Sequence, residues 1–267
     1  MKLIRITLLT LLLVLGFSSL AGAQSNAPLA IILTAKGPIM PPMLEYFERG
    51  IQTAEQRNAE LLVIELNTPG GSVDTMLEMI QAIRASKVPV VVYVAPKDAI
   101  AGSAGALITM AGHASAMAPN TVIGAASPID SSGADIQSTL ETKVKETLKA
   151  KARSLVEDRG EEAVKLAEAM IEDATAVTAK EALEAKLIDF ISSDTEDLLQ
   201  SLDGFTVQMD DGERTLNTKD ARTEKVGINF IEQLLLTLTN PNIAFLLLAI
   251  GVQAILIELS SPGGWVA

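Results

Sequence analysis

Three short runs of β-branched and aliphatic residues constrain the fold more than any other feature of the sequence. They are LAIILT from Leu29, LLVIEL from Leu61 and VPVVVYV from Val88. Each run is mostly apolar at consecutive positions, a pattern typical of strands that are buried on both faces of a sheet. Residues 43–60 and 73–87, which lie between the runs, repeat apolar side chains at helical spacing. Strand–helix–strand units in series predict an α/β fold with a mostly parallel sheet.

The second half of the chain continues the helical pattern over residues 139–159 and 162–172. The segment TAKEALEAKLIDFI then predicts a helix that begins with a capping box of Thr178 and Glu181 and leads into a last strand. Two alternating segments over residues 205–218, joined by a glycine-containing turn, predict a small β-hairpin.

Composition excludes several classes of function. The chain has 267 residues, a formal net charge of −12, no cysteine and one histidine, His113. We expect no nucleic-acid partner, because phosphate contacts need clustered Lys and Arg. The lack of cysteine excludes thiol catalysis, thiolate metal sites and disulfides. The sequence has no motif for a metal or a nucleotide, so we also expect no cofactor.

The N-terminus has the pattern of a secretory signal peptide, to which we assign residues 1–23. Lys2 and Arg5 precede an apolar run over residues 6–20, and AGA then supplies the small residues of a cleavage site. An uncleaved membrane anchor is the alternative. Both interpretations predict that the body of the protein is exported.

A second apolar stretch, IAFLLLAIGVQAILIEL, covers residues 243–259 and approaches the roughly 20 residues that a membrane-spanning helix needs. Ahead of it, FIEQLLLTLTNP over residues 230–241 has the pattern of an amphipathic lead-in. Because the sequence stops soon afterwards, at PGGWVA, we interpret residues 227–267 as the truncated start of a membrane region. A buried hydrophobic helix is the alternative.

Two glycine-containing motifs stand at predicted strand-to-helix junctions. The first is NTPGGS, in which Gly70 and Gly71 permit a tight turn and leave backbone N–H groups uncovered at the start of the next helix. Such groups attract negative charge, so one interpretation is half of an oxyanion hole. An ordinary strand-to-helix turn is the other interpretation.

The second motif is GSAG, in which Ser103 opens a predicted helix over residues 104–110. A serine in this position is usually an N-cap. A cap does not require Gly102, Ala104 and Gly105 around it, whereas a substrate backbone that passes close to Ser103 does. These small neighbours favour Ser103 as a nucleophile.

A nucleophilic serine needs a general base. His113 follows the same predicted helix, about three turns of rise from Ser103, so we expect it to be structural or to lie on the surface. The remaining route is a lysine kept neutral by burial, whose pKa must then fall several units below the reference value of about 10.4. Spacing alone leaves four candidates, which are Lys143, Lys145, Lys149 and Lys151.

PGG at residues 69–71, followed about thirty residues later by a serine among small residues, resembles the serine-protease branch of the ClpP/crotonase fold. The resemblance implies that Ser103 is the nucleophile and that Gly71 and Ala104 supply the oxyanion-hole amides. The run MAPNTVIGAA resembles the ClpP strand that carries the catalytic histidine. Ala126 stands at the matching position here, so the resemblance does not extend to the ClpP triad.

A closer resemblance, over essentially the whole chain, is to the long form of the NfeD family of membrane-bound serine proteases. The motifs that carry it include NTPGG, GSAG, MAPNTVIGAASPI, RSLVEDRG, TAKEALEAKLID, NPNIAFLLLAIG and ELSSPGG. Such proteins use a Ser-Lys dyad, with the lysine at the start of the helix that leads to the RSL…RG segment. The resemblance selects Lys143, and Lys145 is its rival because a shift of two residues stays open.

Together with the patterns above, the resemblance implies four parts: a signal peptide (1–23), a ClpP-like serine protease domain (24–200), a small β-hairpin extension (201–226) and the start of a membrane-spanning region (227–267). It implies a serine endopeptidase of the cell membrane, with its protease domain on the extracytoplasmic side. The implied substrates are hydrophobic segments of stomatin/prohibitin-like membrane proteins, and we expect self-association into a dimer or larger ring. Two alternatives are a scaffold that binds such partners without cleaving them and a crotonase-type acyl-CoA enzyme.

Overall fold

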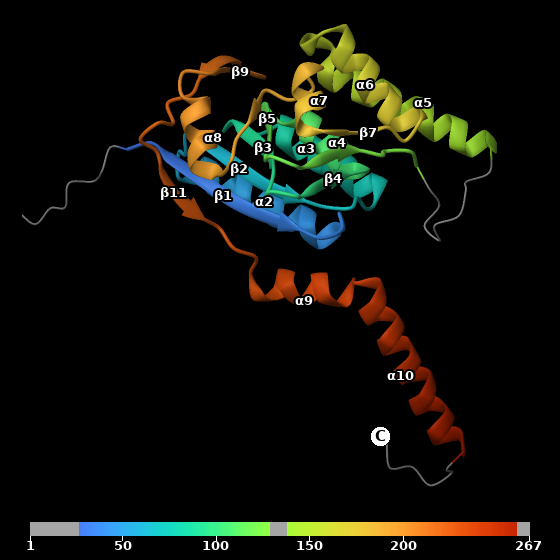
Figure 1. Cartoon of the computed structure of the whole chain (residues 1–267). Coiled ribbons are helices and arrows are strands. Elements are labelled where there is room, and N and C mark those ends of the chain that lie inside the picture. The colour runs from blue at the N-terminus through green and yellow to red at the C-terminus, as the bar shows by residue number, and fades with distance from the viewer. Residues whose placement is uncertain (1–26, 129–137, 261–267) are drawn as a thin grey trace, which may run out of the picture.

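The computed structural model describes residues 27–128 and 138–260 (Figure 1). Within these ranges, six strands form a wholly parallel central sheet. They are β1 (Leu29–Lys36), β2 (Leu61–Asn67), β3 (Val90–Val94), β5 (Ala114–Met117), β8 (Phe190–Ile191) and β11 (Arg222–Lys225). Their order across the sheet is β11-β1-β2-β3-β5-β8. The predicted α/β fold with a mostly parallel sheet is confirmed.

Helices alternate with these strands, as the spacing of apolar residues predicts. They are α2 (Pro41–Gln56), α3 (Val73–Arg84), α4 (Ala104–Ala111), α5 (Ser138–Val156), α6 (Glu161–Glu172), α7 (Ala179–Glu184) and α8 (Thr195–Leu202). The capping box at the start of α7 is present. The Thr178 hydroxyl accepts a hydrogen bond from the Glu181 amide at 3.4 Å, and the Glu181 carboxylate accepts one from the Thr178 amide at 2.8 Å.

Both faces of the central sheet are buried, which explains why its first strands are apolar at consecutive positions. On one face, Ile31 and Ile64 belong to a core that includes side chains of α2 to α6. On the other face, Ile32 and Val63 pack with α8 and with the hairpin β9 (Thr206–Met209) and β10 (Gly212–Thr215). Successive side chains of a strand point to opposite faces, so a sheet covered twice needs apolar residues at every position.

A second, three-stranded sheet lies beside the first and positions GSAG. It contains β4 (Ile100–Gly102), β6 (Val122–Gly124) and β7 (Ala176–Thr178). Strand β4 pairs in parallel with β6 and ends at the residue before Ser103. Because α4 begins at Ala104, the serine lies at the junction of a short strand and a fully buried helix.

The predicted hairpin is confirmed, but the strand that follows it has no sequence signal. Strand β11 consists of RTEK and pairs in parallel with β1, from Leu29 opposite Arg222 to Ile32 opposite Lys225. A strand at the edge of a sheet needs no apolar run, because most of its surface faces water. The chain therefore returns from the hairpin to the central sheet before it leaves the body.

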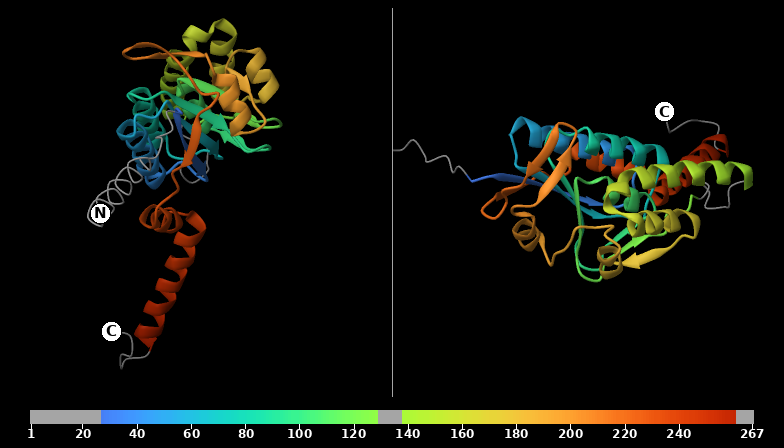
Figure 2. Two further views of the ribbon diagram at one scale, coloured as in Figure 1. Left: turned by 90° about the vertical axis from the view of Figure 1, so that its left-hand side faces the viewer. Right: turned by 90° about the horizontal axis from the view of Figure 1, so that it is seen from above.

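Two helices follow the last strand: α9 (Phe230–Leu238) lies against the body, and α10 (Pro241–Ser260) extends away from it (Figures 1 and 2). The span 242–260 of α10 has a mean hydropathy of 2.3, and none of it is buried. This helix is long and apolar enough to cross a membrane. Its exposure argues against the alternative of a buried core helix.

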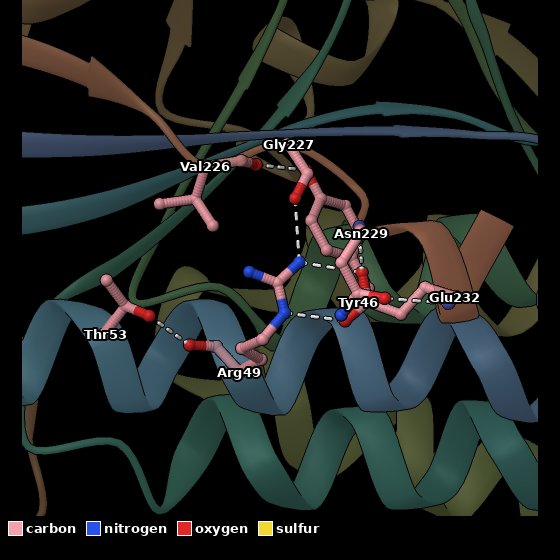
Figure 3. A network of polar contacts seen from close by, with 7 residues as sticks. All are labelled: Tyr46, Arg49, Thr53, Val226, Gly227, Asn229 and Glu232. Atoms are coloured by element: carbon pink, nitrogen blue, oxygen red, sulfur yellow. Dashed lines mark hydrogen bonds and ion pairs between the residues drawn. The ribbon is translucent and has the colours of Figure 1, made fainter.

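An ion pair, which we call the Arg49 clamp, ties α9 to α2 (Figure 3). Arg49 donates hydrogen bonds of 2.6 and 2.7 Å to the two carboxylate oxygens of Glu232, and one of 2.7 Å to the Gly227 carbonyl. The Glu232 side chain is only 5% exposed, and its hydrogen bonds with Arg49 lower the pKa of that carboxyl. Charge-assisted bidentate pairs of this kind are strong and directional.

Two further contacts fix the start of α9 against the body. The Tyr46 hydroxyl donates a 2.6 Å hydrogen bond to the Val226 carbonyl, just before the helix. Glu232 also accepts a hydrogen bond from the Asn229 amide at 2.8 Å, which completes the capping box of α9. The carboxylate that caps α9 is thus the one that Arg49 holds (Figure 3).

We expect Arg49→Met to loosen α9, because the buried Glu232 carboxylate then loses its partner at a cost of about 1–3 kcal/mol. Amide hydrogen exchange within α9 should therefore become about tenfold faster or more. Arg57→Met is the matched control, because Arg57 directly follows α2 and pairs with Glu224 where both side chains are exposed. Equal exchange in the two variants would contradict the role of the clamp.

Candidate active site

Ser103 has a backbone conformation that few residues other than glycine adopt. Its φ is 50° and its ψ is −116°, at the position immediately before α4. Its amide donates a 2.8 Å hydrogen bond to the Gly124 carbonyl, and its carbonyl accepts one of 3.0 Å from Ala106. Strained backbone held from both sides is common at functional sites.

The Ser103 hydroxyl does not cap α4. No side-chain cap hydrogen bond is formed at this helix start, and the hydroxyl has no hydrogen-bond partner among the described residues. The N-cap interpretation is therefore wrong for the side chain, although Ser103 occupies the N-cap position. Ser103 as a whole is half-buried.

Partial strand pairing brings the NTPGGS turn alongside the serine. The Thr68 amide donates a 2.7 Å hydrogen bond to the Ile100 carbonyl, and the Gly102 amide donates one of 2.9 Å to the Thr68 carbonyl. Thr68 and Ala101 thus form an isolated parallel bridge between the end of β2 and β4. The serine follows directly from the paired residues.

Gly70 packs directly against Ser103. A Cβ atom placed on Gly70 would lie 2.7 Å from the Ser103 Cβ and 3.2 Å from its hydroxyl oxygen. Gly70 also has a φ of +118°, which strains any side chain. At the next residue, a Cβ on Gly71 would lie 2.1 Å from the Ile39 carbonyl oxygen. Both positions require glycine for lack of space.

The pairing of Ile39 sets the direction of the Gly71 amide. The Ile39 amide donates to the Gly70 carbonyl at 2.8 Å, and the Ser72 amide donates to the Ile39 carbonyl at 2.9 Å. In a parallel ladder, the residue between two such bonds directs its own N–H to the opposite side. The Gly71 N–H is therefore directed away from Ile39.

Gly71 is exposed and Ala104 is 4% exposed, and the backbone amides of both are candidate donors to a ligand. Neither amide donates a hydrogen bond to any residue that the structure describes. Ala104 is the first residue of α4, where unpaired N–H groups and the helix dipole favour negative charge. Two such donors beside a serine hydroxyl suit the negative oxygen of a tetrahedral intermediate.

His113 is structural, as predicted. It is 8% exposed, its Nδ1 accepts a 3.1 Å hydrogen bond from the Val90 amide, and its own amide donates to the Val90 carbonyl at 2.8 Å. Burial lowers the pKa of His113 to about 4. The histidine therefore ties β5 to β3 as a neutral group, and no hydrogen bond joins it to the serine among the described residues.

The candidate lysines differ in their surroundings. Lys149 forms ion pairs with Glu146 at 3.0 Å and Glu172 at 3.1 Å, which raise its pKa and keep it charged. The Lys145 ammonium donates a 3.4 Å hydrogen bond to the Glu172 carbonyl. Lys143 is exposed on α5, whose first turns project from the body (Figure 1). In the described part of the chain, no hydrogen bond joins a lysine to Ser103.

Some residues that shape this site carry weak sequence signals. The Thr68 hydroxyl accepts a 3.0 Å hydrogen bond from the Gly70 amide, which closes the turn. A threonine two residues before a glycine is a known turn signal, but it is weak. The contact of Gly70 with Ser103 has no local signal, because the two residues are far apart in the sequence.

The family model for the N-terminal domain of NfeD1b matches residues 33–226. The chain belongs to the NfeD1b family. It is 36% identical over 233 residues to the membrane-bound protease PH1510 of Pyrococcus horikoshii, covering 85% of this chain and 52% of that protein. It is 27% identical over 266 residues to the membrane protein NfeD1b of Bacillus subtilis, covering 92% and 55%. The chain spans about half the length of the curated relatives it matches.

Solved structures of family members share the fold. A lysine-to-alanine mutant of the 1510-N membrane-bound stomatin-specific protease, in complex with a substrate peptide, matches with a TM-score of 0.72 and 32% identity, over 79% of this chain and 97% of that one. A serine-to-alanine mutant of the same protease matches with a TM-score of 0.68 and 32% identity, over 76% and 98%. ClpP1 from Listeria monocytogenes, at 16% identity, a TM-score of 0.52 and coverage of 62% and 94%, shares the fold alone. The predicted ClpP-like architecture and family are confirmed.

Gly70→Ala should slow the reaction of Ser103 with a serine-directed phosphonate, because the new methyl group contacts the serine. Overpacking costs about 1–3 kcal/mol, which corresponds to a roughly ten- to hundredfold lower rate of labelling. Gly37→Ala is the matched control, since Gly37 has the same φ of +118° and a Cβ there meets nothing within 4 Å. Labelling is followed by mass spectrometry. An equal decrease of the labelling rate in both variants would show that backbone strain, and not the contact with Ser103, is the cause.

The buried His113 predicts a loss of stability in acid. The folded state keeps His113 neutral down to a pKa of about 4, whereas the unfolded chain takes up a proton near pH 6.5. The contribution of His113 to the free energy of unfolding is therefore fully present above pH 6.5. It is lost as the pH falls toward 4, which lowers the free energy of unfolding by about 3 kcal/mol. Urea unfolding at pH 7 and pH 4.5 measures the difference, which His113→Gln should reduce. An unchanged pH dependence in that variant would contradict the prediction.

Proposed function

We propose that this chain is a membrane-associated serine endopeptidase with Ser103 as nucleophile, Lys143 as general base, and the Gly71 and Ala104 amides as oxyanion donors. The observation that carries the proposal is the strained, non-capping Ser103, set beside a glycine turn and two available amides. Support for hydrolysis also comes from the relative that is named a membrane-bound protease.

The proposed reaction proceeds through an acyl-enzyme. The neutral Lys143 amine takes the proton of the Ser103 hydroxyl as its oxygen attacks the scissile carbonyl. The two amides stabilise the oxyanion, and the protonated lysine then gives its proton to the leaving amine. In the second half, the same amine activates the water that releases the acyl group. No metal or cofactor takes part in these steps.

Lys143 needs a drier environment to act as a base. A lysine amine is neutral near pH 7 only when burial or a like charge lowers its pKa. Lys143 is exposed in the single chain, on the projecting end of α5. The bound substrate or a second copy of the chain is proposed to cover it, which is consistent with the expected self-association. In this proposal the site is complete only in the assembled, substrate-bound protein.

The proposed substrates are hydrophobic segments of stomatin-type membrane proteins. The support is the name of the solved relative, a stomatin-specific protease with a bound substrate peptide. In this chain, Val73 at the start of α3 and Ile100 in β4 are exposed apolar residues that flank the glycine turn and the serine. Apolar side chains on both sides of the cleavage site favour an apolar peptide.

The membrane region is proposed to hold the protease domain on the extracytoplasmic side. The named relatives are membrane proteins, and α10 supports membrane association of this chain. The orientation rests on the signal-peptide pattern of residues 1–23, which lie outside the described residues.

Single substitutions test the dyad. Ser103→Ala and Lys143→Ala should each lower the cleavage of an apolar stomatin-type peptide by about a thousandfold or more. Lys145→Ala, two residues further along α5, is the matched control and should keep most of the activity. Activity is measured on the detergent-solubilised chain by sequencing the fragments.

Other outcomes would change the proposal in defined ways. Full activity in Lys143→Ala, with loss in Lys145→Ala, would move the base to the rival lysine. A wild-type chain that captures stomatin-type proteins but neither cleaves them nor reacts with a phosphonate at Ser103 would support the scaffold alternative.

A further inference from the structure

Helix α9 has two different sides. Its inner side carries Glu232, which is 4% exposed, and Leu236, which packs against the core. Its outer side carries four large apolar residues, of which Phe230 is 81% and Ile231 65% exposed. The other two are Leu234 and Leu238. At about 100° per residue, these four side chains lie within an arc about 100° wide.

The outer side of α9 is uncharged. The helix reads FIEQLLLTL, and its one charged residue is the glutamate that the Arg49 clamp holds inward. Gln233 and Thr237 are exposed along one flank of the apolar arc. A contiguous exposed apolar arc without charge marks a surface that another apolar phase or partner covers.

The length of α10 indicates what covers this arc. Its 20 residues rise about 1.5 Å each, or about 30 Å in all, which equals the thickness of the hydrocarbon core of a bilayer. A spanning α10 therefore uses its full length, and its first turn lies at the edge of the hydrocarbon. Only Thr239 and Asn240 separate the two helices, and two residues reach about 7 Å. If α10 spans the bilayer, the C-terminal end of α9 is thus restricted to the headgroup layer.

We propose that α9 lies flat in the headgroup layer of the bilayer that α10 enters, with Phe230, Ile231, Leu234 and Leu238 directed toward the acyl chains. Figure 1 shows the arrangement that this requires, with α10 turning steeply away from α9 on the side opposite the body. Interfacial helices bury their apolar side about 5–10 Å into this layer. Because the side is uncharged, apolar burial and not attraction to anionic lipid holds it there.

The Arg49 clamp extends this proposal from the helix to the body. Bidentate contacts with Glu232 and the hydrogen bond to Gly227 hold α9 along α2 (Figure 3). A helix fixed in the membrane plane then fixes the tilt of α2 and of the sheet on which α2 packs. The body is therefore held against the membrane in one orientation instead of swinging on a tether.

Depth-dependent quenching tests the position of α9. The chain contains no cysteine, so Ile231→Cys and Leu234→Cys each allow one fluorescent label on the proposed lipid-facing side. Glu184→Cys on α7, across the body from α9, is the aqueous control (Figure 1). The full chain is reconstituted into phosphatidylcholine vesicles that contain lipids with a nitroxide at acyl carbon 5 or carbon 12.

We expect both α9 labels to be quenched several-fold more than the Glu184 label, more by the shallow nitroxide than by the deep one, and equally at low and high salt. Quenching no greater than that of the control would overturn the proposal. Quenching that disappears in high salt would show an electrostatic contact instead. Lipid quenching could also appear only when little unlabelled chain is present. That result would show that a second copy of the chain covers the arc, and it would overturn the proposal as well.

A second measurement tests the clamp independently of activity. With the label at Glu184→Cys, Arg49→Met should increase the rotational freedom of the body, measured as faster decay of fluorescence anisotropy in vesicles. The labels on α9 should keep their lipid quenching in the same variant. Unchanged anisotropy would show that the clamp does not set the tilt of the body.

Discussion

The site depends on an exchange of backbone hydrogen bonds at the end of β2. Up to Asn67 the strand is part of the central sheet, and from Thr68 onward its residues pair with β4 on one side and with Ile39 on the other. This divided pairing sets the glycine turn against the serine and directs the Gly71 amide away from Ile39. Backbone groups make this pairing, so most side chains in the turn do not affect it. Two positions, however, must have no side chain at all. That is why the turn contains Gly70 and Gly71, each with no space for a Cβ atom.

Residues of the same type differ in protonation because their neighbours in the fold differ. Four lysines lie within two and a half turns of α5, yet Lys149 is held charged by two glutamates, whereas Lys143 lies on the projecting end of the helix. His113 would be an obvious base by residue type, but burial against the Val90 amide keeps it neutral and structural. In each case the neighbours decide the protonation state, and those neighbours come from other elements of the fold. Residue type alone therefore does not show which side chain can act as a general base.

Much of the architecture is predictable from the sequence, because strands that are buried on both faces have apolar residues at consecutive positions. The strands that begin at Leu29 and Leu61 and the capping box at Thr178 follow from local patterns, and the small neighbours of Ser103 indicate a site. Strand β11 is not predictable, since RTEK pairs at an exposed edge. The Arg49 clamp is not predictable either, because Arg49 and Glu232 lie 183 residues apart. Lys143 lies on the exposed, projecting end of α5, and no local pattern in the sequence predicts that placement.

The late position of β11 has a consequence for biosynthesis. Among the described residues, β1 is the first strand to be made, and one of its edges is covered only when Arg222–Lys225 pairs with it. Until the ribosome has added nearly two hundred further residues, the backbone groups along that edge have no native partner. A chain that still lacks residues 222–225 therefore presents an unpaired edge of β1, and unpaired strand edges are prone to aggregation. The short charged strand β11, which comes just before α9 and α10, is the segment that finally covers this edge of β1.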